Sequence, residues 1–477
     1  MTTDIHRLKT GVPGLDQLLH GGIPEGRATL ITGRSGTGKT VLALQMAANF
    51  ARQGLPVIIV AVEESPQDLI TSADALGLDF SGLSAAAKIR FADVTRLDGS
   101  MVVSGQYDLE GLRHRLEALA GQIGARALVL DSATALFSPR PPAEELRSHF
   151  FQLVSTLRSL DLTSIILAEA EQDYGPLTTL GVEDYVCDLT IILRNIVDGS
   201  RRRRSLEINK YRRSGHYKGE YPCTITPTGL AVFPVETSDH PVDQNVERFS
   251  SGVAGLDEMT HGGWLRNSIL IVRGPTGSGK TLLAGLYARA GAVRGERVVY
   301  YGFEEPRPLL LRNYRAIGID LDKYVESNQL RVICRYAEAT SLEDLLVDLR
   351  LELEALNPSL IVFDSISSIE HSSSPRGFRH FMIGVASILR QHGRTALLTQ
   401  TMPFPGGKDA ASSAPYLSTI ADAILTLDYS TQGYHLDREM RVVKTRGSAH
   451  EPHPYRLSIQ EGGLTVTRMN LQEVSAR

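Results

Sequence analysis

The chain has 477 residues, of which 42% are hydrophobic and 22% are charged, and its net charge is −4. This length suffices for two domains with separate cores, and the composition excludes a disordered chain or a coiled coil. No apolar stretch reaches the roughly 20 residues of a membrane-spanning helix, and the polar start lacks the apolar segment of a signal peptide. We therefore expect a cytoplasmic protein whose three separated cysteines are reduced and buried, at Cys187, Cys223 and Cys334.

Several motifs occur twice along the chain. Residues 11–16 correspond to 252–257, residues 33–40 to 274–281 and residues 63–64 to 304–305, an offset of 241 in each case. Such an offset indicates a duplicated domain, because solenoid repeats span only about 20–50 residues. We predict a first domain over residues 1–233, a polar linker over 234–247, and a second domain with a short tail over 248–477.

In chain order, the first copy alternates short apolar runs with longer amphipathic segments. The predicted strands are 28–31, 57–62, 127–130, 165–167 and 190–193, and the predicted helices are 40–52, 66–76, 109–123 and 144–160. The second copy repeats the pattern with strands at 268–272, 298–302, 360–363 and 396–398. This alternation predicts an α/β fold, with a mainly parallel sheet flanked by helices in each copy.

Each copy carries Gly-x-x-x-x-Gly-Lys-Thr between a predicted strand and a predicted helix, which is the context of a phosphate-binding loop. Backbone N–H groups of such a loop surround the phosphates of ATP at a helix N-terminus, the lysine reaches the β- and γ-phosphates, and the threonine hydroxyl binds Mg²⁺. The predicted ATP-binding residues are Gly33, Ser35, Gly36, Thr37, Gly38, Lys39 and Thr40 in the first copy, and Gly274, Thr276, Gly277, Ser278, Gly279, Lys280 and Thr281 in the second.

An aspartate follows an apolar run in each copy, Asp131 in the first and Asp364 in the second, and a serine follows each aspartate. Such an aspartate holds the coordination shell of Mg²⁺, so we predict metal sites at Thr40 with Asp131 and at Thr281 with Asp364. The alternative is that either aspartate only caps the following helix.

Paired glutamates end the second predicted strand of each copy, Glu63 with Glu64 and Glu304 with Glu305. Carboxyl ends of parallel strands face the ligand crevice, where a carboxylate can deprotonate the group that attacks the γ-phosphate. Adjacent strand residues point to opposite faces, so one acid of each pair is expected to act. We also assign Glu304 to the metal site. The alternative is a solvated acidic turn.

Further segments, at 201–208, 216–222, 417–424 and 444–447, resemble the KaiC family of circadian clock ATPases, a tandem duplication within the RecA superfamily. The resemblance covers residues 8–468 and implies two RecA-like P-loop domains in a hexamer of two stacked rings, with ATP between neighbouring subunits. Beyond the loops, the resemblance assigns to ATP the residues Lys210, Tyr211, Arg212, His216, Arg438, Lys444, Thr445 and Arg446.

The resemblance also implies a division of chemistry between the rings. Ser418 and Thr419 align with the family's phospho-acceptors, and Ser413 with a weaker neighbouring site. The second ring would then act as a Ser/Thr autokinase and autophosphatase in which Glu304 accepts the hydroxyl proton. In the first ring water would attack, and Glu63 would serve ATP hydrolysis.

Several departures from the family pattern bear on partners. The chain ends at Arg477, so we expect no long tail to recruit the activator KaiA. Ile317 occupies a place near the adenine where the family can carry an aromatic residue, and Arg213 replaces a glycine after the first Lys-x-Arg. Residues 101–109 resemble the loop that engages KaiB, so the resemblance suggests a KaiB-like partner, and an output histidine kinase as a further one.

Two other functions stay open at this point. One is a RecA- or DnaB-like DNA-dependent ATPase, and the other is a signalling scaffold whose nucleotide only holds the ring together. The four arginines at 201–204 favour DNA, but they form one short run in a slightly acidic chain, so we predict an exposed or interface loop there. The retained glutamate pairs argue against the scaffold.

Overall fold

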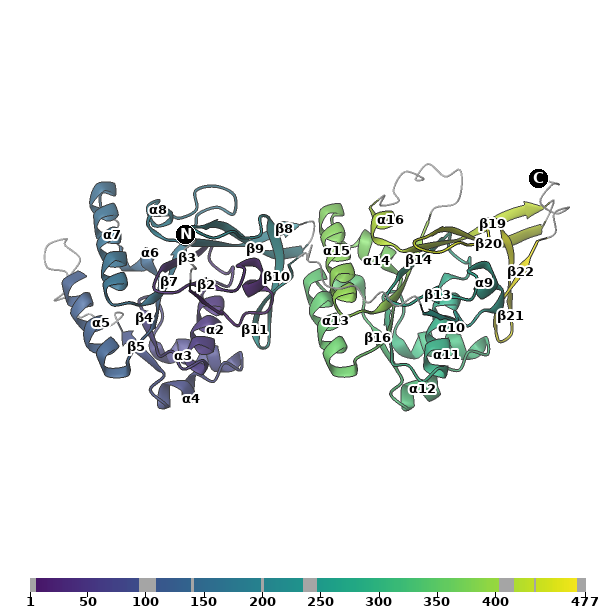
Figure 1. The fold of residues 1–477 in the computed structure, drawn as a ribbon, viewed down its shortest axis with the longest axis horizontal. Coiled ribbons are helices and arrows are strands. Elements are labelled where there is room, and N and C mark those ends of the chain that lie inside the picture. The colour runs from purple at the N-terminus through teal and green to yellow at the C-terminus, as the bar shows by residue number, and fades with distance from the viewer. Residues whose placement is uncertain are drawn as a thin grey trace. The chain divides into compact units, whose positions relative to one another are not determined.

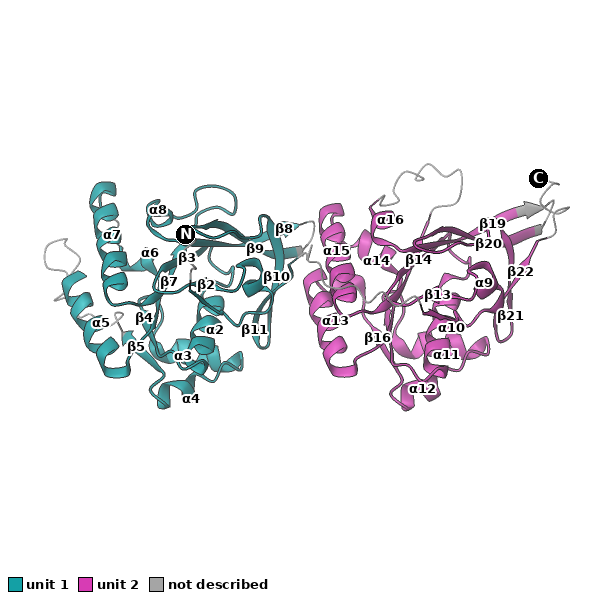
Figure 2. Cartoon of the chain, viewed as in Figure 1, with its two compact units in different colours: residues 1–234 teal, residues 235–477 magenta. Residues whose placement is uncertain are grey.

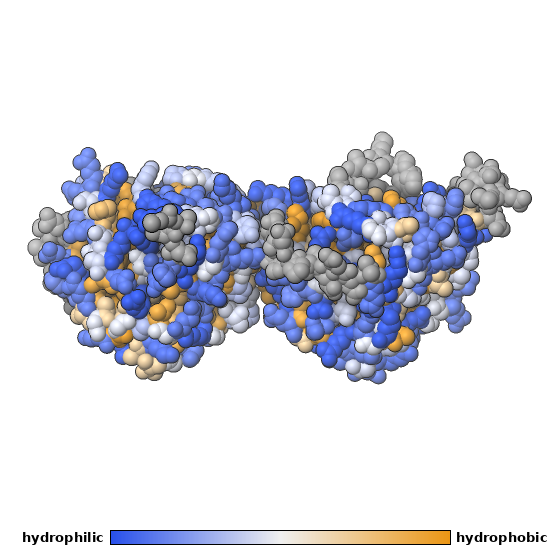
Figure 3. All heavy atoms as spheres, viewed as in Figure 1, coloured by the Kyte–Doolittle hydropathy of each residue, from blue (hydrophilic) through white to orange (hydrophobic). Residues whose placement is uncertain are grey.

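The computed structural model describes residues 6–93, 109–138, 141–198, 201–234, 247–402, 416–432 and 435–469. The chain divides into two compact units, Met1–Pro234 and Val235–Arg477 (Figure 2). The visible face of each unit carries mostly hydrophilic side chains with scattered apolar ones (Figure 3). Within the described ranges, no helix combines the length and the apolar character that a membrane crossing requires.

The first unit contains the following elements (Figure 1). Its helices are α1 Leu15–Leu18, α2 Lys39–Arg52, α3 Pro66–Ala75, α4 Phe80–Ala85, α5 Leu109–Ile123, α6 Ala133–Leu136, α7 Ala143–Ser159 and α8 Glu183–Val186. Its strands are β1 Arg7–Leu8, β2 Ile23–Pro24, β3 Ala28–Gly33, β4 Val57–Ala61, β5 Ile89–Asp93, β6 Ala127–Asp131, β7 Thr163–Glu169, β8 Leu189–Asp198, β9 Arg201–Tyr211, β10 Glu220–Thr226 and β11 Gly229–Val232.

The main sheet of the first unit has the order β11-β10-β9-β8-β3-β7-β6-β4-β5. The strands from β8 to β5 pair in parallel, and β9, β10 and β11 continue the sheet as antiparallel strands. The predicted α/β fold with a mainly parallel sheet is confirmed. The strands β3 and β4 are buried along their whole length, as parallel strands between two helix layers must be.

Helices cover both faces of this sheet. Helix α2 packs against β6 and β7 on one face. On the other face, α5 and α7 bury residues that recur at helical spacing, such as Leu112 with Leu116 and Phe150 with Val154. Helix α3 begins at Ser65, whose side chain accepts a hydrogen bond from the Asp68 backbone N–H. The central strand β3 therefore ends in a position framed by both helix layers.

The second unit repeats this architecture. Its helices are α9 Ala254–Met259, α10 Lys280–Val293, α11 Arg307–Ala316, α12 Asp322–Glu326, α13 Leu342–Leu356, α14 Ile366–His371, α15 Pro375–Gln391 and α16 Leu417–Ile420, with a 3₁₀ turn at Ala337–Ala339. Its strands are β12 Arg248–Phe249, β13 Trp264–Leu265, β14 Ile269–Gly274, β15 Val298–Gly302, β16 Leu330–Cys334, β17 Leu360–Asp364, β18 Thr395–Thr401, β19 Ala423–Gln432, β20 His435–Thr445, β21 Tyr455–Gln460 and β22 Gly463–Arg468.

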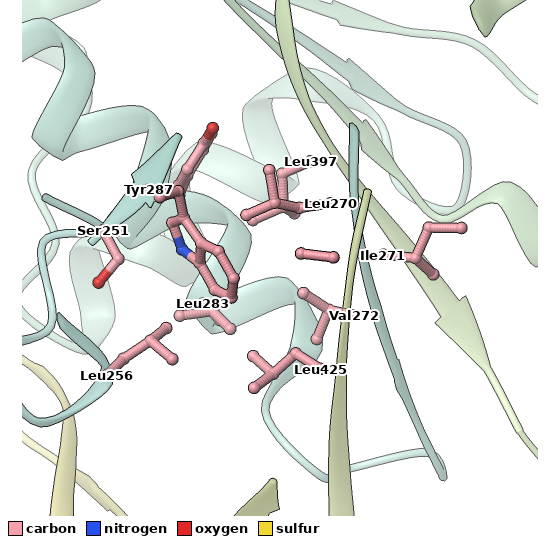
Figure 4. Close-up of a pocket in the computed structure, with 11 residues that line it drawn as sticks. Ser251, Leu256, Leu270, Ile271, Val272, Leu283, Tyr287, Leu397 and Leu425 are labelled. Atoms are coloured by element: carbon pink, nitrogen blue, oxygen red, sulfur yellow. The ribbon is translucent and has the colours of Figure 1, made fainter. Parts of the chain in front are cut away.

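The sheet of the second unit runs β16-β15-β17-β18-β14-β19-β20-β21-β22, which is the order of the first unit. Helices α13 and α15 contact each other and lie on the side of the sheet away from α10 (Figure 1). Beneath the sheet, Leu256, Leu283 and Leu425 surround a cavity of about 10 Å³ (Figure 4). A cavity of this size and apolar lining is a packing gap in the core and is too small for a ligand.

The antiparallel strands correct one prediction. The arginines at 201–204 lie in strand β9, between β8 and β10, and do not form the predicted loop. Arg203 pairs with Asp198 of β8 at 3.3 Å, and Arg202 donates to the Asn195 carbonyl at 3.2 Å. Both guanidinium groups bind the neighbouring strand, and Asp198 offsets the charge of Arg203.

The position of the glutamate pairs corrects a second prediction. Strand β4 ends at Ala61 and β15 ends at Gly302, so both pairs lie past the strands, in the turns before α3 and α11. The alternation of strand side chains therefore does not decide which acid of a pair faces the site. Among the cysteines, Cys187 and Cys223 are buried and Cys334 is half-buried, and none forms a disulfide in the described residues.

Candidate nucleotide-binding sites

The phosphate-binding loop of the first unit joins the end of β3 to the start of α2. Gly36 and Gly38 have φ values of 76° and 105°, in the region that favours glycine, and the chain turns sharply there. Gly38 is the N-cap of α2, so the first backbone N–H groups of the helix are directed toward the loop. Gly277 and Gly279 have φ values of 79° and 105° at the start of α10. Both copies of the motif thus form a tight glycine turn at a helix N-terminus, as the sequence predicts.

The loop lysines fold back over their own loops. Lys39 Nζ donates to the carbonyl oxygens of Gly33 at 2.8 Å and Arg34 at 3.0 Å. Lys280 Nζ donates to the carbonyl oxygens of Gly274 and Pro275, each at 2.9 Å. Burial lowers the pKa of each lysine, and neighbouring carboxylates partly oppose this effect. A phosphate in the turn would give each buried ammonium group an anionic partner.

A hydroxyl and a carboxylate meet beside each loop. Thr40 Oγ1 donates to Asp131 at 2.8 Å, and Thr281 Oγ1 donates to Asp364 at 3.3 Å. The alternative that these aspartates cap the following helices is wrong, because Ser132 and Ser365 occupy the N-cap positions. The structure therefore places the predicted metal-site oxygens next to each other in both units.

These oxygens fit Mg²⁺. The ion prefers oxygen ligands and is usually held by one or two protein groups together with substrate phosphates. No cluster of three or more histidine, cysteine or acidic side chains suited to a metal occurs in the ranges that the structure covers. Burial, together with the charges of Glu63 and Glu64, raises the pKa of Asp131 to about 6. A divalent cation there would offset this accumulated negative charge.

The first glutamate of each pair is oriented by the serine that follows the metal-site aspartate. Ser132 Oγ donates to Glu63 at 2.5 Å, and Ser365 Oγ donates to Glu304 at 2.8 Å. Glu305, in contrast, accepts a hydrogen bond from Asn313 at 2.9 Å. The expectation of one active acid per pair stays a prediction, and this geometry favours Glu63 and Glu304 for that role.

Sequence reasoning missed several groups at these sites. Glu169, at the end of β7, opposes the lowering of the Lys39 pKa more than any other carboxylate does. In the second unit, Tyr300 and Thr399 donate to Asp364 at 2.6 and 2.5 Å. Ser368 donates to Glu304 at 3.2 Å. An acid at the end of a predicted strand was a usable signal for Glu169, whereas the hydroxyl groups come together only in the folded sheet.

An open cleft of about 460 Å³ lies over the second loop. Its lining joins the predicted site residues to the helix α11, and Ile317 takes part in it. The lining residues that were predicted are Thr276, Gly277, Gly279, Lys280, Thr281, Glu304, Glu305 and Asp364. The cleft therefore gathers the phosphate, metal and acid positions of one unit at one place.

The cations that the resemblance assigns to ATP divide into two groups. Arg438 lies at its own unit's loop, where its Nε donates to the Gly277 carbonyl at 3.2 Å. Lys210 and Arg212 contact α8, which precedes β8, whereas the loop follows the end of the parallel strand β3. The structure thus places these two cations at the end of the sheet where the parallel strands begin, opposite the end that carries the loop of the same chain.

The second unit repeats this placement, with Lys444 and Arg446 bound to the short helix α16 before β19. The remaining assigned side chains are also engaged away from their own loops. Tyr211 donates to the Gly22 carbonyl at 2.9 Å, Thr445 donates to the Ser448 carbonyl at 2.6 Å, and burial lowers the pKa of His216 beside His20.

The predicted phospho-acceptors lie at this same end of the sheet. Ser418 and Thr419 belong to α16, and the Thr419 hydroxyl donates to the Tyr416 carbonyl at 2.6 Å. Ser413 lies outside the described residues, as does most of the segment 101–109.

Comparison with known proteins identifies the family. The family model described as the KaiC ATPase matches residues 8–237 and again residues 249–470. The circadian clock oscillator protein KaiC of Picosynechococcus sp. is 37% identical over 97% of this chain and 90% of its own length. KaiC 1 of Synechocystis sp. is 37% identical, and KaiC of Synechococcus elongatus is 36% identical, each over 96% of this chain and 88% of its own length. With a double match to the family model and relatives aligned along nearly its whole length, the chain belongs to the KaiC family of ATPases.

Proposed function

We propose that this protein is an ATP-hydrolysing Ser/Thr autokinase and autophosphatase of a circadian clock or timer, working as a hexamer of two stacked rings. The observation that carries the proposal is the placement of two kinds of group in each unit. The loop, the predicted metal-site oxygens and the oriented glutamate lie where the central parallel strands end. The cation pair, which is Lys210 with Arg212 in the first unit and Lys444 with Arg446 in the second, lies where the parallel strands β8 and β19 begin. ATP bound between subunits would meet the loop of one copy and the cations of the next.

Each group then has a defined role in phosphoryl transfer. Lys39 and Lys280 bind the phosphates, and the cation pair of the adjacent subunit neutralises charge that develops on the γ-phosphate. Thr40 with Asp131, and Thr281 with Asp364, would hold Mg²⁺, which would offset the charge of the phosphates. Glu63, held by Ser132, accepts a proton from the attacking water in the first ring. Glu304, held by Ser365, accepts the hydroxyl proton of Ser418 or Thr419 from the adjacent subunit.

Partner proteins belong to the same proposal. A KaiB-like protein at residues 101–109 and an output histidine kinase stay predictions, because residues 94–108 lie outside the described ranges. DNA is not proposed as a partner, since Arg202 and Arg203 are engaged with β8.

The test is intact-mass analysis of the purified protein after incubation with Mg²⁺ and ATP. Wild-type protein should gain one or two phosphoryl groups, and Ser418→Ala with Thr419→Ala should gain none while still hydrolysing ATP. Hydrolysis without any mass gain would contradict the autokinase and leave an ATPase. Hydrolysis that requires added DNA would favour a DNA-dependent motor.

A further inference from the structure

The cation pair of the first unit is bound by the segment that precedes β8. Lys210 Nζ donates to the backbone carbonyl of Asp184, and Arg212 donates to that of Tyr185 at 2.7 Å. The backbone N–H of Arg212 also donates to the Asp188 carbonyl at 2.8 Å. These contacts fix the direction in which both cations leave β9.

The second unit forms the same contacts with its own residues. Lys444 Nζ donates to the Ser418 carbonyl at 2.6 Å, and Arg446 donates to the Thr419 carbonyl at 2.6 Å. The backbone N–H of Arg446 donates to the Asp422 carbonyl at 2.8 Å. In this later part of the units the offset is 234 residues, from 210 to 444 and from 184 to 418, compared with 241 at the phosphate-binding loops. Position 184 of the first unit is therefore equivalent to the acceptor position 418 of the second.

The side chains at these equivalent positions differ in charge. Asp184 lies 3.4 Å from Lys210 Nζ and accepts a hydrogen bond from the Thr190 hydroxyl at 2.6 Å. Thr190 is fully buried, so its hydroxyl fixes the position of the Asp184 carboxylate from the interior of the unit. In the second unit, Ser418 stands at the acidic position and Ile424 stands where Thr190 does, paired with Lys444 as Thr190 is with Lys210.

The first unit therefore offsets part of its lysine's charge permanently, whereas among the residues that the structure describes no carboxylate lies within ion-pair distance of Lys444. Burial and the neighbouring Arg446 lower the pKa of Lys444, while Asp422 partly opposes them. The Asp422 carboxylate is shared with Arg446 at 3.4 Å and Arg390 at 3.6 Å. A phosphate on Ser418 would add about −1.5 to −2 charges next to Lys444.

We propose that an acidic group at this position weakens, without abolishing, the attraction between the lysine and the nucleotide of the adjacent subunit. Asp184 does so permanently in the first unit, and Ser418 does so in the second only while it carries a phosphate. This inference rests on the proposed function for the phosphorylation itself and for the placement of ATP between subunits.

The chemical step balances within those roles. The bond between the γ-phosphorus and the oxygen that bridges it to ADP breaks, and ADP leaves. A bond forms between that phosphorus and Ser418 Oγ, and the hydroxyl proton passes to Glu304 of the adjacent subunit. The new phosphate then attracts Lys444 within its own chain, so modification of Ser418 weakens nucleotide binding at the adjacent second-unit site and slows further transfer to Thr419.

The test compares Ser418→Asp with Ser418→Asn in the full-length protein, because the two side chains have the same size and differ in charge. The second-unit affinity for a fluorescent ATP analogue is taken from a two-site titration, and transfer to Thr419 is followed by mass analysis. We expect the aspartate variant to bind about 1.5- to 5-fold more weakly than the asparagine variant, the range for a partly exposed ion pair. The difference should shrink as salt rises.

Adding Lys444→Met to both variants separates this device from direct repulsion of ATP. The difference between aspartate and asparagine should disappear in that background, whereas direct repulsion would preserve it. The reverse test lies in the first unit, where Asp184→Asn keeps the hydrogen bond from Thr190 and should tighten nucleotide binding by a similar factor. Lys210→Met should abolish that gain.

The outcomes distinguish this inference from the proposed function. Equal affinities of the Ser418→Asp and Ser418→Asn variants, or a difference that persists with Lys444→Met, would overturn the inference alone. A wild-type protein that carries phosphate on Thr419 but never on Ser418 would overturn the switching role of this position and leave the autokinase standing, whereas a protein that carries no phosphate at all would overturn both.

Discussion

Replacing Glu63 with glutamine should remove most ATP hydrolysis without disturbing the fold. Glu63 is exposed, and it accepts a hydrogen bond from the Ser132 hydroxyl at 2.5 Å. A glutamine oxygen can accept the same bond, so we expect the free energy of unfolding to change by less than about 0.5 kcal/mol. The amide cannot take a proton from water. Loss of a positioned base lowers the rate about 10²–10⁴-fold, equivalent to about 2.7–5.5 kcal/mol of transition-state stabilisation.

Glu64→Gln is the matched control, since Glu64 is also exposed and lies one residue further along the same turn. Steady-state phosphate release should fall strongly for Glu63→Gln and by less than about tenfold for Glu64→Gln. Phosphorylation of the second ring, followed by intact mass, should continue in both variants. Equal losses in the two variants, or full hydrolysis in Glu63→Gln, would refute the assignment of the first acid as the base.

Three further predictions follow from the same geometry. Removal of nucleotide should convert hexamers into smaller species in sedimentation, and Lys210→Ala should raise the ATP concentration that assembly requires. Hexamers unaffected by either change would contradict ATP-bridged interfaces. Thr40→Ala should raise the Mg²⁺ concentration needed for half-maximal ATP hydrolysis, and Thr281→Ala should raise the one needed for half-maximal phosphorylation. Unchanged Mg²⁺ titrations would place the metal elsewhere. Leu425→Ala should destabilise the second unit by about 2–5 kcal/mol in denaturant unfolding, whereas Ile459→Ala, at a 40% exposed position, should cost far less; equal costs would contradict the core assignment.

The parallel part of the fold could be predicted because its determinants are local. Runs buried on both faces, such as β3 and β4, read as continuous apolar segments, and the helix predicted at 109–123 has the bounds of α5. The glycines of the loops require positive φ values, so motif and geometry agree there.

The antiparallel extension could not be predicted in this way. Strand β9 begins with four arginines, and such a charged run predicts a loop when the sequence is considered alone. Only the folded sheet shows that carboxylate and carbonyl groups of β8 lie beside these arginines. The end of β4 was predicted one residue too far, because Val62 continues the apolar run after the pairing stops. The predicted bounds 298–302 match β15, but Glu304 and Glu305 lie past its end. Which acid faces the site depended on Ser132 and Ser365, which a different strand supplies.

The placement of the cation pairs is a tertiary property of the same kind. From spacing alone, Lys-x-Arg is an ordinary strand end, and only the pairing of β8 with both β3 and β9 shows that Lys210 and Arg212 point away from their own loop. The equivalence of Asp184 with Ser418 also became visible only from the matching hydrogen bonds, since their local sequences differ.

The most direct test of the account mixes two inactive proteins. One carries Lys39→Met, which disables its first loop but leaves Lys210 intact, and the other carries Lys210→Ala, which leaves its first loop intact. If ATP sites are completed by the adjacent subunit, each protein alone should hydrolyse little ATP in the first ring, and random equal mixtures should regain activity at about a quarter of their interfaces. No regain in verified mixed hexamers, or full hydrolysis by Lys210→Ala alone, would contradict completion of the site by a neighbouring subunit.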